Sequence, residues 1–112
     1  MTQGEEDRAA LRAIIADPRV EALVNLAEEC SEVIKEVCKM QRFGVEHVGP
    51  TAGGEPALPA RVLLSREAGN LYRMILVLER AGVIDMAEFE FGAAEKAAKL
   101  RRWSNIPEAW LP

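Results

Sequence analysis

Residues 44–60 read GVEHVGPTAGGEPALPA and contain four glycines and three prolines. Neither a helix nor a strand tolerates this composition, because glycine loses much conformational entropy on ordering and proline lacks a backbone N–H. The segment therefore forms a long loop between its neighbours. Long loops in small domains are typically functional or mobile, so we expect the 44–60 loop to be a lid over a site or a mobile segment.

Four stretches around this loop carry apolar residues at helical spacing, and none alternates convincingly with the period of a strand. The predicted helices cover about Glu5–Ala16, Pro18–Phe43, Arg61–Ala81 and Met86–Trp103. Asp17 followed by Pro18 is a typical helix start, and Asp85 is a plausible N-cap. Gly44 and Gly82 are typical residues for a helix end.

The chain has 112 residues, which is room for one domain and one core. We predict an all-α fold: a small, oligomeric bundle of about four helices. The single domain spans residues 1–112, with a core of about 18–103. Aromatic residues make up only 5% of the chain, so this core must be aliphatic.

Charge and hydropathy exclude several classes of protein. The formal net charge is −4, whereas a protein that grips nucleic acid needs a basic footprint, so we expect no nucleic-acid partner. The longest wholly apolar run, Met74–Leu78, is too short to span a membrane. The first residues, MTQGEEDRAA, are unlike a signal peptide. We therefore expect a cytoplasmic protein with no membrane partner.

The predicted helix over 18–43 has a wide apolar arc and, beside its edge, an acidic stripe. The arc contains Leu23, Leu26, Ala27, Cys30, Val33, Ile34, Val37 and Cys38. The stripe contains Asn25, Glu29, Glu32 and Glu36, with Glu28 one step round the helix. Glu29 and Glu32 project from one face about one turn apart, where like charges repel unless a cation lies between them.

In the predicted helix over 61–81, two polar residues interrupt the apolar stripe. Its apolar stripe contains Leu63, Leu64, Leu71, Met74, Ile75 and Leu78. Glu67 and Asn70 fall inside that stripe. A carboxylate on a core-facing stripe costs several kcal/mol unless it is paired, protonated or bound to a metal. Such a departure from local rules often marks a functional residue, although an ion pair with an arginine would also explain Glu67.

Each of the two predicted helices thus presents a polar pair towards the expected bundle interior. The pairs are Glu29 with Glu32 on residues 18–43, and Glu67 with Asn70 on residues 61–81. Three carboxylates and an amide oxygen form an all-oxygen donor set, which suits Mg²⁺ or Mn²⁺. Zinc fits poorly, because the single histidine, His47, lies in the loop and there is no His/Cys cluster. The competing interpretation of the glutamates on residues 18–43 is a solvated helix face.

The acidic motif also resembles that of a known family. Residues 26–34, LAEECSEVI, followed by Lys39 and by RFG at 42–44, resemble the first motif of MazG-like nucleotide pyrophosphohydrolases, especially short phage-type members. That family combines EExxE on one helix with ExxD on a later helix. The first motif is complete here as Glu28, Glu29 and Glu32. The second reads EAGN, with Asn70 in place of its aspartate; the similarity covers about residues 20–103.

The resemblance implies an all-α fold that assembles as a homodimer or homotetramer. It implies Mg²⁺-dependent hydrolysis of a nucleoside triphosphate to the monophosphate and pyrophosphate. Glu29, Glu32 and Glu67 would be the catalytic metal ligands, and Asn70 stands at the position of a fourth ligand. Glu28 would belong to the outer shell.

Basic and aromatic residues supply substrate-binding candidates. Lys39 and Arg42 follow the acidic motif, and Lys96 and Lys99 lie on the last predicted helix. Each could contact a polyphosphate, or simply belong to a solvated face. Phe43, Tyr72 and Trp103 could stack on a base or pack in the core.

Two further expectations concern assembly and activity. The helix over 61–81 is apolar around more than half its circumference at Met74–Leu78, so a partner chain should cover it. An amide at Asn70 carries no charge, which should weaken a metal site. The alternative to an active enzyme is therefore a weak or inactive relative that acts as a nucleotide-binding or structural helical assembly.

Overall fold

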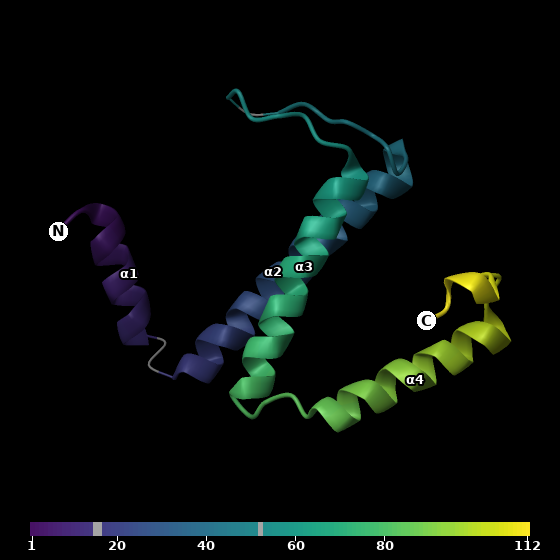
Figure 1. The fold of residues 1–112 in the computed structure, drawn as a ribbon. Helices are drawn as coiled ribbons and strands as arrows, with labels where there is room; N and C mark the ends of the chain where they lie inside the picture. Colours follow the sequence, from purple (N-terminus) through teal and green to yellow (C-terminus); the bar gives the residue numbers. More distant parts are fainter. Residues whose placement is uncertain (15–16, 52) are drawn as a thin grey trace.

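A computed structural model describes residues 1–14, 17–51 and 53–112. In these ranges the fold is all-helical and contains no strand, as predicted (Figure 1). The elements are α1 (Gln3–Ile14), α2 (Pro18–Phe43), α3 (Ala60–Arg80), α4 (Met86–Trp103) and the short 3-10 helix η1 (Glu108–Trp110). None of the helices in the described ranges has the length and apolar character that crossing a membrane requires.

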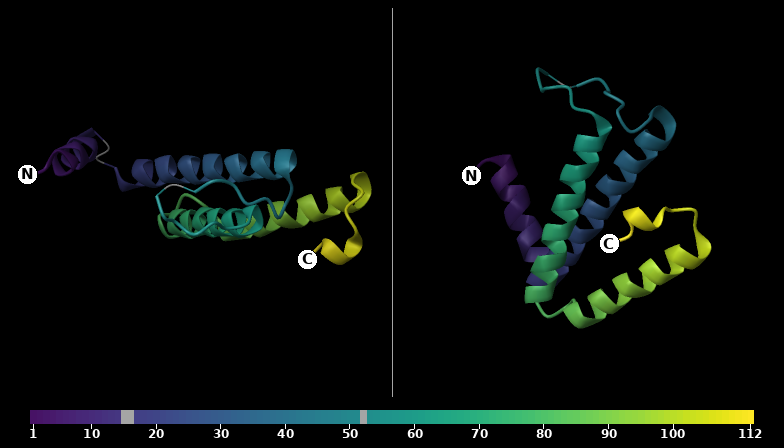
Figure 2. Two further views of the ribbon diagram at one scale, coloured as in Figure 1. Left: turned by 90° about the horizontal axis from the view of Figure 1, so that it is seen from above. Right: turned by 45° about the vertical axis from the view of Figure 1, so that its right-hand side comes forward.

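The helices α2 and α3 form an antiparallel pair and are the two elements in extensive contact within the described ranges. Figure 2 shows them side by side in both views. The helices α1 and α4 leave the same end of this pair and diverge from it, while the 44–60 loop crosses the opposite end (Figure 1). The result is a flat molecule of 55 × 41 × 17 Å.

Local sequence signals set the helix ends. The Asp17 side chain caps α2 by accepting a first-turn N–H at 2.9 Å, and Gly44 ends that helix with φ 98°. Gly82, with φ 76°, follows α3, and Val83 N–H donates back to the carbonyl of Leu78 at 2.9 Å, as in a Schellman motif. Asp85 caps α4 in the same way as Asp17 caps α2. The predicted caps are therefore confirmed.

The helix bounds differ little from the prediction. The helix α1 begins at Gln3 instead of Glu5, and residues 15 and 16 at its predicted end lie outside the described residues. The helix α3 begins at Ala60, one residue before the predicted start. Both α2 and α4 have the predicted bounds.

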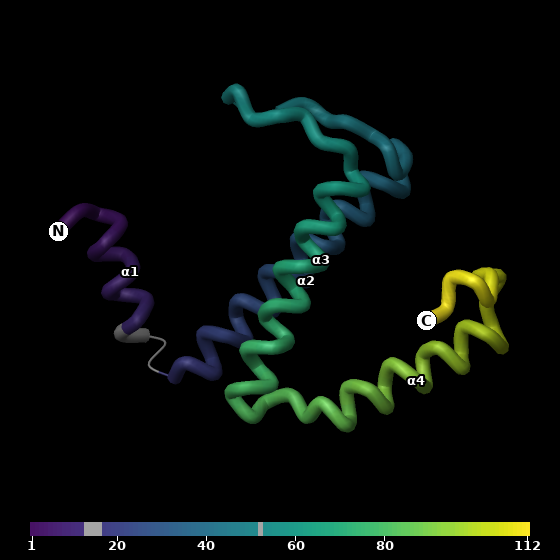
Figure 3. The backbone as a smooth tube through the Cα atoms, viewed as in Figure 1, coloured from purple at the N-terminus to yellow at the C-terminus, as the bar shows by residue number. Residues whose placement is uncertain are grey.

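The first residues of the 44–60 loop cap the start of α3. Pro59, the N-cap residue of α3, makes no side-chain capping hydrogen bond. Instead, Ala60 N–H donates to the carbonyl of His47 at 2.7 Å, and Arg61 N–H donates to that of Val45 at 3.0 Å. These bonds satisfy donors that a helix start leaves free. The loop thus doubles back from α2 onto α3, as the tube in Figure 3 shows.

The buried residues of the chain lie between α2 and α3. Ala22, Ala60 and Leu78 are the buried apolar residues among those described, and Leu78 is 0% exposed. The apolar arc of α2 is not their partner, because most of it lies open in the single chain. Its exposed members are Leu23, Ala27, Cys30, Ile34, Val37 and Cys38. Within one chain, the apolar arc predicted on this helix is therefore largely uncovered.

The single chain exposes far more surface than a compact protein of its size. Its accessible surface is 8773 Å² and its radius of gyration 18.2 Å. A compact monomer of this length has about 6,100 Å² and about 13 Å. The excess follows from the divergence of α1 and α4 and from the bare apolar arc of α2.

Candidate functional site

Glu29 lies on the face of α2 that packs against α3. It stands seven residues after Ala22 and seven before Glu36, which are the two buried residues of this helix. Seven residues are nearly two full turns, so the three side chains share one face. Glu29 is half-buried there. The sequence predicts that Glu29 projects towards the bundle interior, and the structure places it within the helix contact.

Glu67 has the equivalent position on α3. It stands seven residues after Ala60 and eleven before Leu78, the two buried residues of α3, and is itself half-buried. The prediction that Glu67 falls inside the apolar stripe is confirmed, whereas Asn70, which was predicted to fall inside it too, is exposed. Each helix of the pair thus places a carboxylate where a coiled contact normally holds an apolar side chain. Removing these two charges from water costs free energy unless each carboxylate has a cationic or hydrogen-bonding partner.

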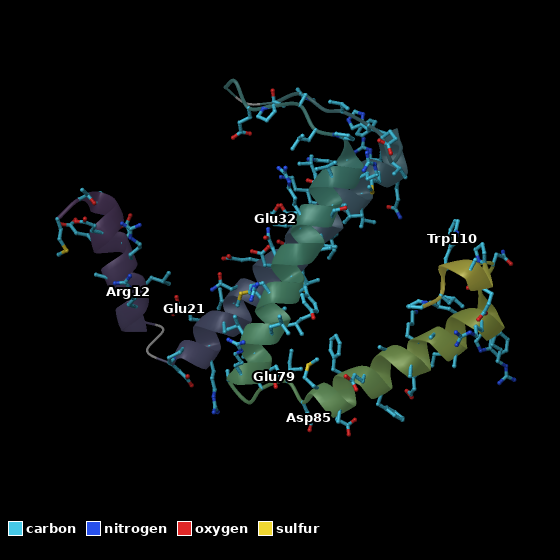
Figure 4. All side chains as sticks on the ribbon, in the orientation of Figure 1. Arg12, Glu21, Glu32, Glu79, Asp85 and Trp110 are labelled. Atoms are coloured by element: carbon cyan, nitrogen blue, oxygen red, sulfur yellow. The ribbon has the colours of Figure 1, made fainter. Side chains whose placement is uncertain are left out.

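The other predicted ligands lie at the edge of the same contact. Asn70 is exposed, and its Nδ2 donates to Glu67 Oε2 at 3.4 Å. Glu32 is exposed and lies midway along the helix pair, where it is labelled in Figure 4. Glu28 is also exposed. Asn70 turns its amide N–H towards the carboxylate and would have to present Oδ1 to bind a cation.

The predicted ligands share one helix contact, but the isolated chain does not gather them into a metal centre. Across the described ranges, no three His, Cys, Asp or Glu side chains lie close enough together to hold a metal ion. The donor chemistry still fits a hard cation, since all four groups offer oxygen. Side-chain rotation or a partner chain would be needed to complete such a site.

Glu36 is the residue that the sequence reasoning did not place in the site. It is 6% exposed and is the buried charged residue of the described chain. Lys39 Nζ lies 3.4 Å from Glu36 Oε1, and Oε2 has no hydrogen-bond partner among the described residues. Glu36 stands seven residues after Glu29 in the sequence. This spacing could have placed Glu36 on the same contact face of the helix.

A cavity of about 620 Å³ adjoins Glu36 at the loop end of the helix pair. It is bounded by the last turns of α2, the first turns of α3 and the 44–60 loop. The lining includes Glu36, Lys39 and Phe43 from α2, Arg66 from α3, and His47 and Glu55 from the loop. The volume is in the range of small-molecule sites.

The predicted substrate-binding residues divide into two groups. Lys39 and Phe43 line the cavity, and the guanidinium carbon of Arg42 lies 5.3 Å from the centre of the Phe43 ring. Lys96 and Lys99 are exposed on α4, a helix that diverges from the α2–α3 pair (Figure 1).

Two of the predicted stacking residues lie outside the cavity lining. Tyr72 is exposed on α3, and Trp103 is exposed at the end of α4, where Arg102 covers its ring at 4.9 Å. Phe43 is the one predicted aromatic residue that lines the cavity, where its ring lies 4.8 Å from that of His47.

Comparison with known proteins identifies no relative of the chain, so a proposal about function depends on the residues described above. No family model, no curated protein and no solved structure matches the chain.

Proposed function

We propose that the chain is a Mg²⁺-dependent nucleoside triphosphate pyrophosphohydrolase of the MazG-like type, acting as a cytoplasmic homo-oligomer. The observation that carries this proposal is the placement of Glu29 and Glu67. Both are half-buried on the contact faces of α2 and α3, at positions where an apolar residue would stabilise the pair more. A cation shared between the helices would offset the cost of burying two like charges.

Glu29, Glu32 and Glu67 would hold Mg²⁺ or Mn²⁺, with Asn70 as a neutral fourth ligand through Oδ1. Glu28 would act from the outer shell. The bound cation would supply charge neutralisation on the phosphate oxygens. The three carboxylates come from two helices, so the α2–α3 pairing itself sets the distance between them.

In the proposed reaction, a water oxygen forms a bond to the α-phosphorus. The bond from that phosphorus to the α–β bridging oxygen breaks, and pyrophosphate leaves with the electron pair. A glutamate carboxylate takes the proton of the water. Lys39 and Arg42, at the cavity end of α2, would contact the phosphates. Lys96 and Lys99 would reach a carboxylate site only in an assembly, because α4 diverges from the pair.

Assembly into a homodimer or homotetramer is part of the proposal. The surface exceeds that of a compact monomer by an amount comparable to the area that obligate oligomers bury. Exposed apolar side chains on α2 and α4, among them Ile34 and Phe91, would form the contact. A two-helix contact with three buried apolar residues among those described is a small core for a chain of this length.

The test is pyrophosphate release by wild type, Glu29→Gln and Glu67→Gln with Mg²⁺. Each variant keeps the shape of the side chain but removes its charge, so we expect release to fall at least about a hundredfold. Glu88→Gln on α4 is the matched control, because Glu88 is exposed and lies far along the chain from the carboxylates. Equal activity in all four proteins would overturn the proposed site.

A second candidate is a nucleotide-binding assembly without turnover. Asn70 favours it, because an amide in place of a carboxylate lowers the negative charge of the ligand set. The same samples separate the two functions: nucleotide binding without pyrophosphate release supports the binder, and metal-dependent release supports the enzyme.

A further inference from the structure

We propose that the cavity at the loop end of the α2–α3 pair binds a guanine base through the carboxylate of Glu36. The inference rests on the proposed function for the identity of the ligand as a nucleotide, and it adds the base that the site selects. It starts from Glu36, which is 6% exposed, lines the cavity and has one oxygen without a hydrogen-bond partner among the described residues.

A buried carboxylate is stable only when donors form hydrogen bonds with its oxygens, because it has lost its contacts with water. Lys39 Nζ, at 3.4 Å from Oε1, is a long contact from a side chain that is 42% exposed, so it compensates Glu36 poorly. Leaving an acceptor of this kind unsatisfied is expensive, and native structures rarely do so without a functional reason. A ligand that donates N–H groups to Glu36 would remove the cost once the carboxylate turns Oε2, which has almost no accessible surface, towards the cavity.

The geometry of a carboxylate selects among the bases. Its two oxygens accept two parallel N–H bonds, which is the pattern that an arginine fork satisfies. Guanine offers two adjacent donors on its Watson–Crick edge, N1–H and the 2-amino group. Adenine and cytosine each offer one donor beside an acceptor nitrogen, and uracil offers one donor between two carbonyls. Guanine is therefore the base that matches Glu36.

The remaining lining fits the rest of a nucleotide. The rings of Phe43 and His47, whose centres are 4.8 Å apart, provide aromatic surface for stacking. Lys39 and Arg66 line the same cavity and suit a phosphate. They also disfavour a cationic guanidinium, the other common partner of a carboxylate fork. The volume of about 620 Å³ is ample for a nucleoside.

The position of the cavity agrees with the carboxylate site. Glu36 follows Glu32 by one turn of α2, a rise of about 6 Å. Glu29, Glu36 and Phe43 are spaced by seven residues and so follow one face of the helix. A base held against Glu36 at the loop end of the pair would leave the phosphates to follow the edge of the helix contact, where Glu32 is exposed.

The test is calorimetric titration of the full chain with GMP, IMP, AMP, CMP and UMP in EDTA, with arginine methyl ester as a further ligand. IMP lacks only the 2-amino group of guanine. We expect GMP to bind at least about tenfold more tightly than IMP and than the other three nucleotides, since a hydrogen bond to a charged acceptor is lost. Equal affinity for GMP and IMP, or preference for another base or for arginine, would overturn the inference.

Glu36→Gln adds a readout that a purely structural role of Glu36 would not change. Glutamine presents one acceptor and one donor, a pair that each of the four bases can meet on its Watson–Crick edge, so the preference for GMP should fall at least about tenfold. Glu95→Gln, at an exposed glutamate of α4 outside the cavity, should keep the wild-type ranking. A uniform loss for all bases in Glu36→Gln would contradict base recognition by this residue.

The two proposals can fail separately. Pyrophosphate release with no GMP preference removes the guanine assignment and leaves the enzyme. Selective GMP binding without release from any triphosphate removes the enzyme and leaves the guanine site. The comparison of GMP with IMP uses wild-type protein, so it does not depend on the folding of a variant.

Discussion

Asn70 and Glu67 form a hydrogen bond across one turn of α3, in which Asn70 Nδ2 donates to Glu67 Oε2 at 3.4 Å. The contact gives the half-buried carboxylate a neutral partner in the absence of a cation. An aspartate at this position would place two like charges about one turn apart. We expect Asn70 to spare the helix pair this repulsion and to weaken the proposed metal site, and the two effects can be measured separately.

We expect Asn70→Asp to lower the melting temperature in EDTA and to raise it in Mg²⁺ or Mn²⁺. In EDTA the new repulsion should cost about 0.5 kcal/mol. With a cation, the added carboxylate strengthens the site, and binding to the folded state stabilises it. Thermal melting with and without metal measures both changes.

Asn105→Asp, in the exposed tail after α4, is the control for a general effect of added charge. It should respond to metal as the wild type does. If Asn70→Asp also shows no metal-dependent change in melting temperature, Asn70 does not belong to a cation site.

Leu78 is the side chain most deeply buried in the α2–α3 contact, at 0% exposure. We expect Leu78→Ala to lower the free energy of unfolding by about 2–5 kcal/mol, because it removes buried methyl groups and leaves a cavity. Urea denaturation followed by circular dichroism measures the loss. Leu11→Ala, at an exposed leucine of α1, should cost less than about 1 kcal/mol. Similar losses in the two variants would mean that Leu78 is not at the centre of the core.

The helix ends could be predicted from sequence because each is encoded locally. Asp17 with Pro18, Gly44, Gly82 and Asp85 set the ends of three helices through bonds within a few residues of themselves. The start of α3 carries no such signal. The loop caps the start of α3 through the backbone carbonyls of residues 45 and 47. Every residue has such a carbonyl, so this cap cannot be predicted from residue type.

The packing faces could not be predicted as well. Hydrophobic periodicity reports which side of a helix is apolar, but not which neighbour covers it. On α3 the apolar stripe does face α2, with Glu67 inside it as predicted. On α2 the apolar arc around Ile34 stays open in the single chain, while Glu29 and Glu36 face α3. If some apolar residues of a helix contact its own chain and others contact a partner chain, the sequence alone does not tell which residues belong to which contact.

The open arc of α2 leads to a prediction about assembly. Ile34 is 62% exposed in the single chain, and a partner should cover it. We expect Ile34→Glu to lower the sedimentation coefficient of the protein at micromolar concentration, because a buried charge would break the contact. Lys35→Glu changes charge on the neighbouring, polar side of α2 and should leave the oligomer intact. A monomeric wild type would contradict the proposed assembly.

Cys30 and Cys38 lie on the same arc and are exposed free thiols in the single chain. If an oligomer covers the arc, both thiols should react slowly with Ellman's reagent at high protein concentration and faster on dilution. A reaction rate per thiol that does not change with protein concentration would show that the arc remains open in solution.

The most direct test of the central claim is pyrophosphate release by the wild-type chain from a panel of ribo- and deoxyribonucleoside triphosphates. Each reaction is run with Mg²⁺, with Mn²⁺ and with EDTA. The account predicts release that requires the metal, is abolished by EDTA and is highest for a guanine nucleotide. A folded, oligomeric sample that releases no pyrophosphate from any nucleotide with either metal would contradict it.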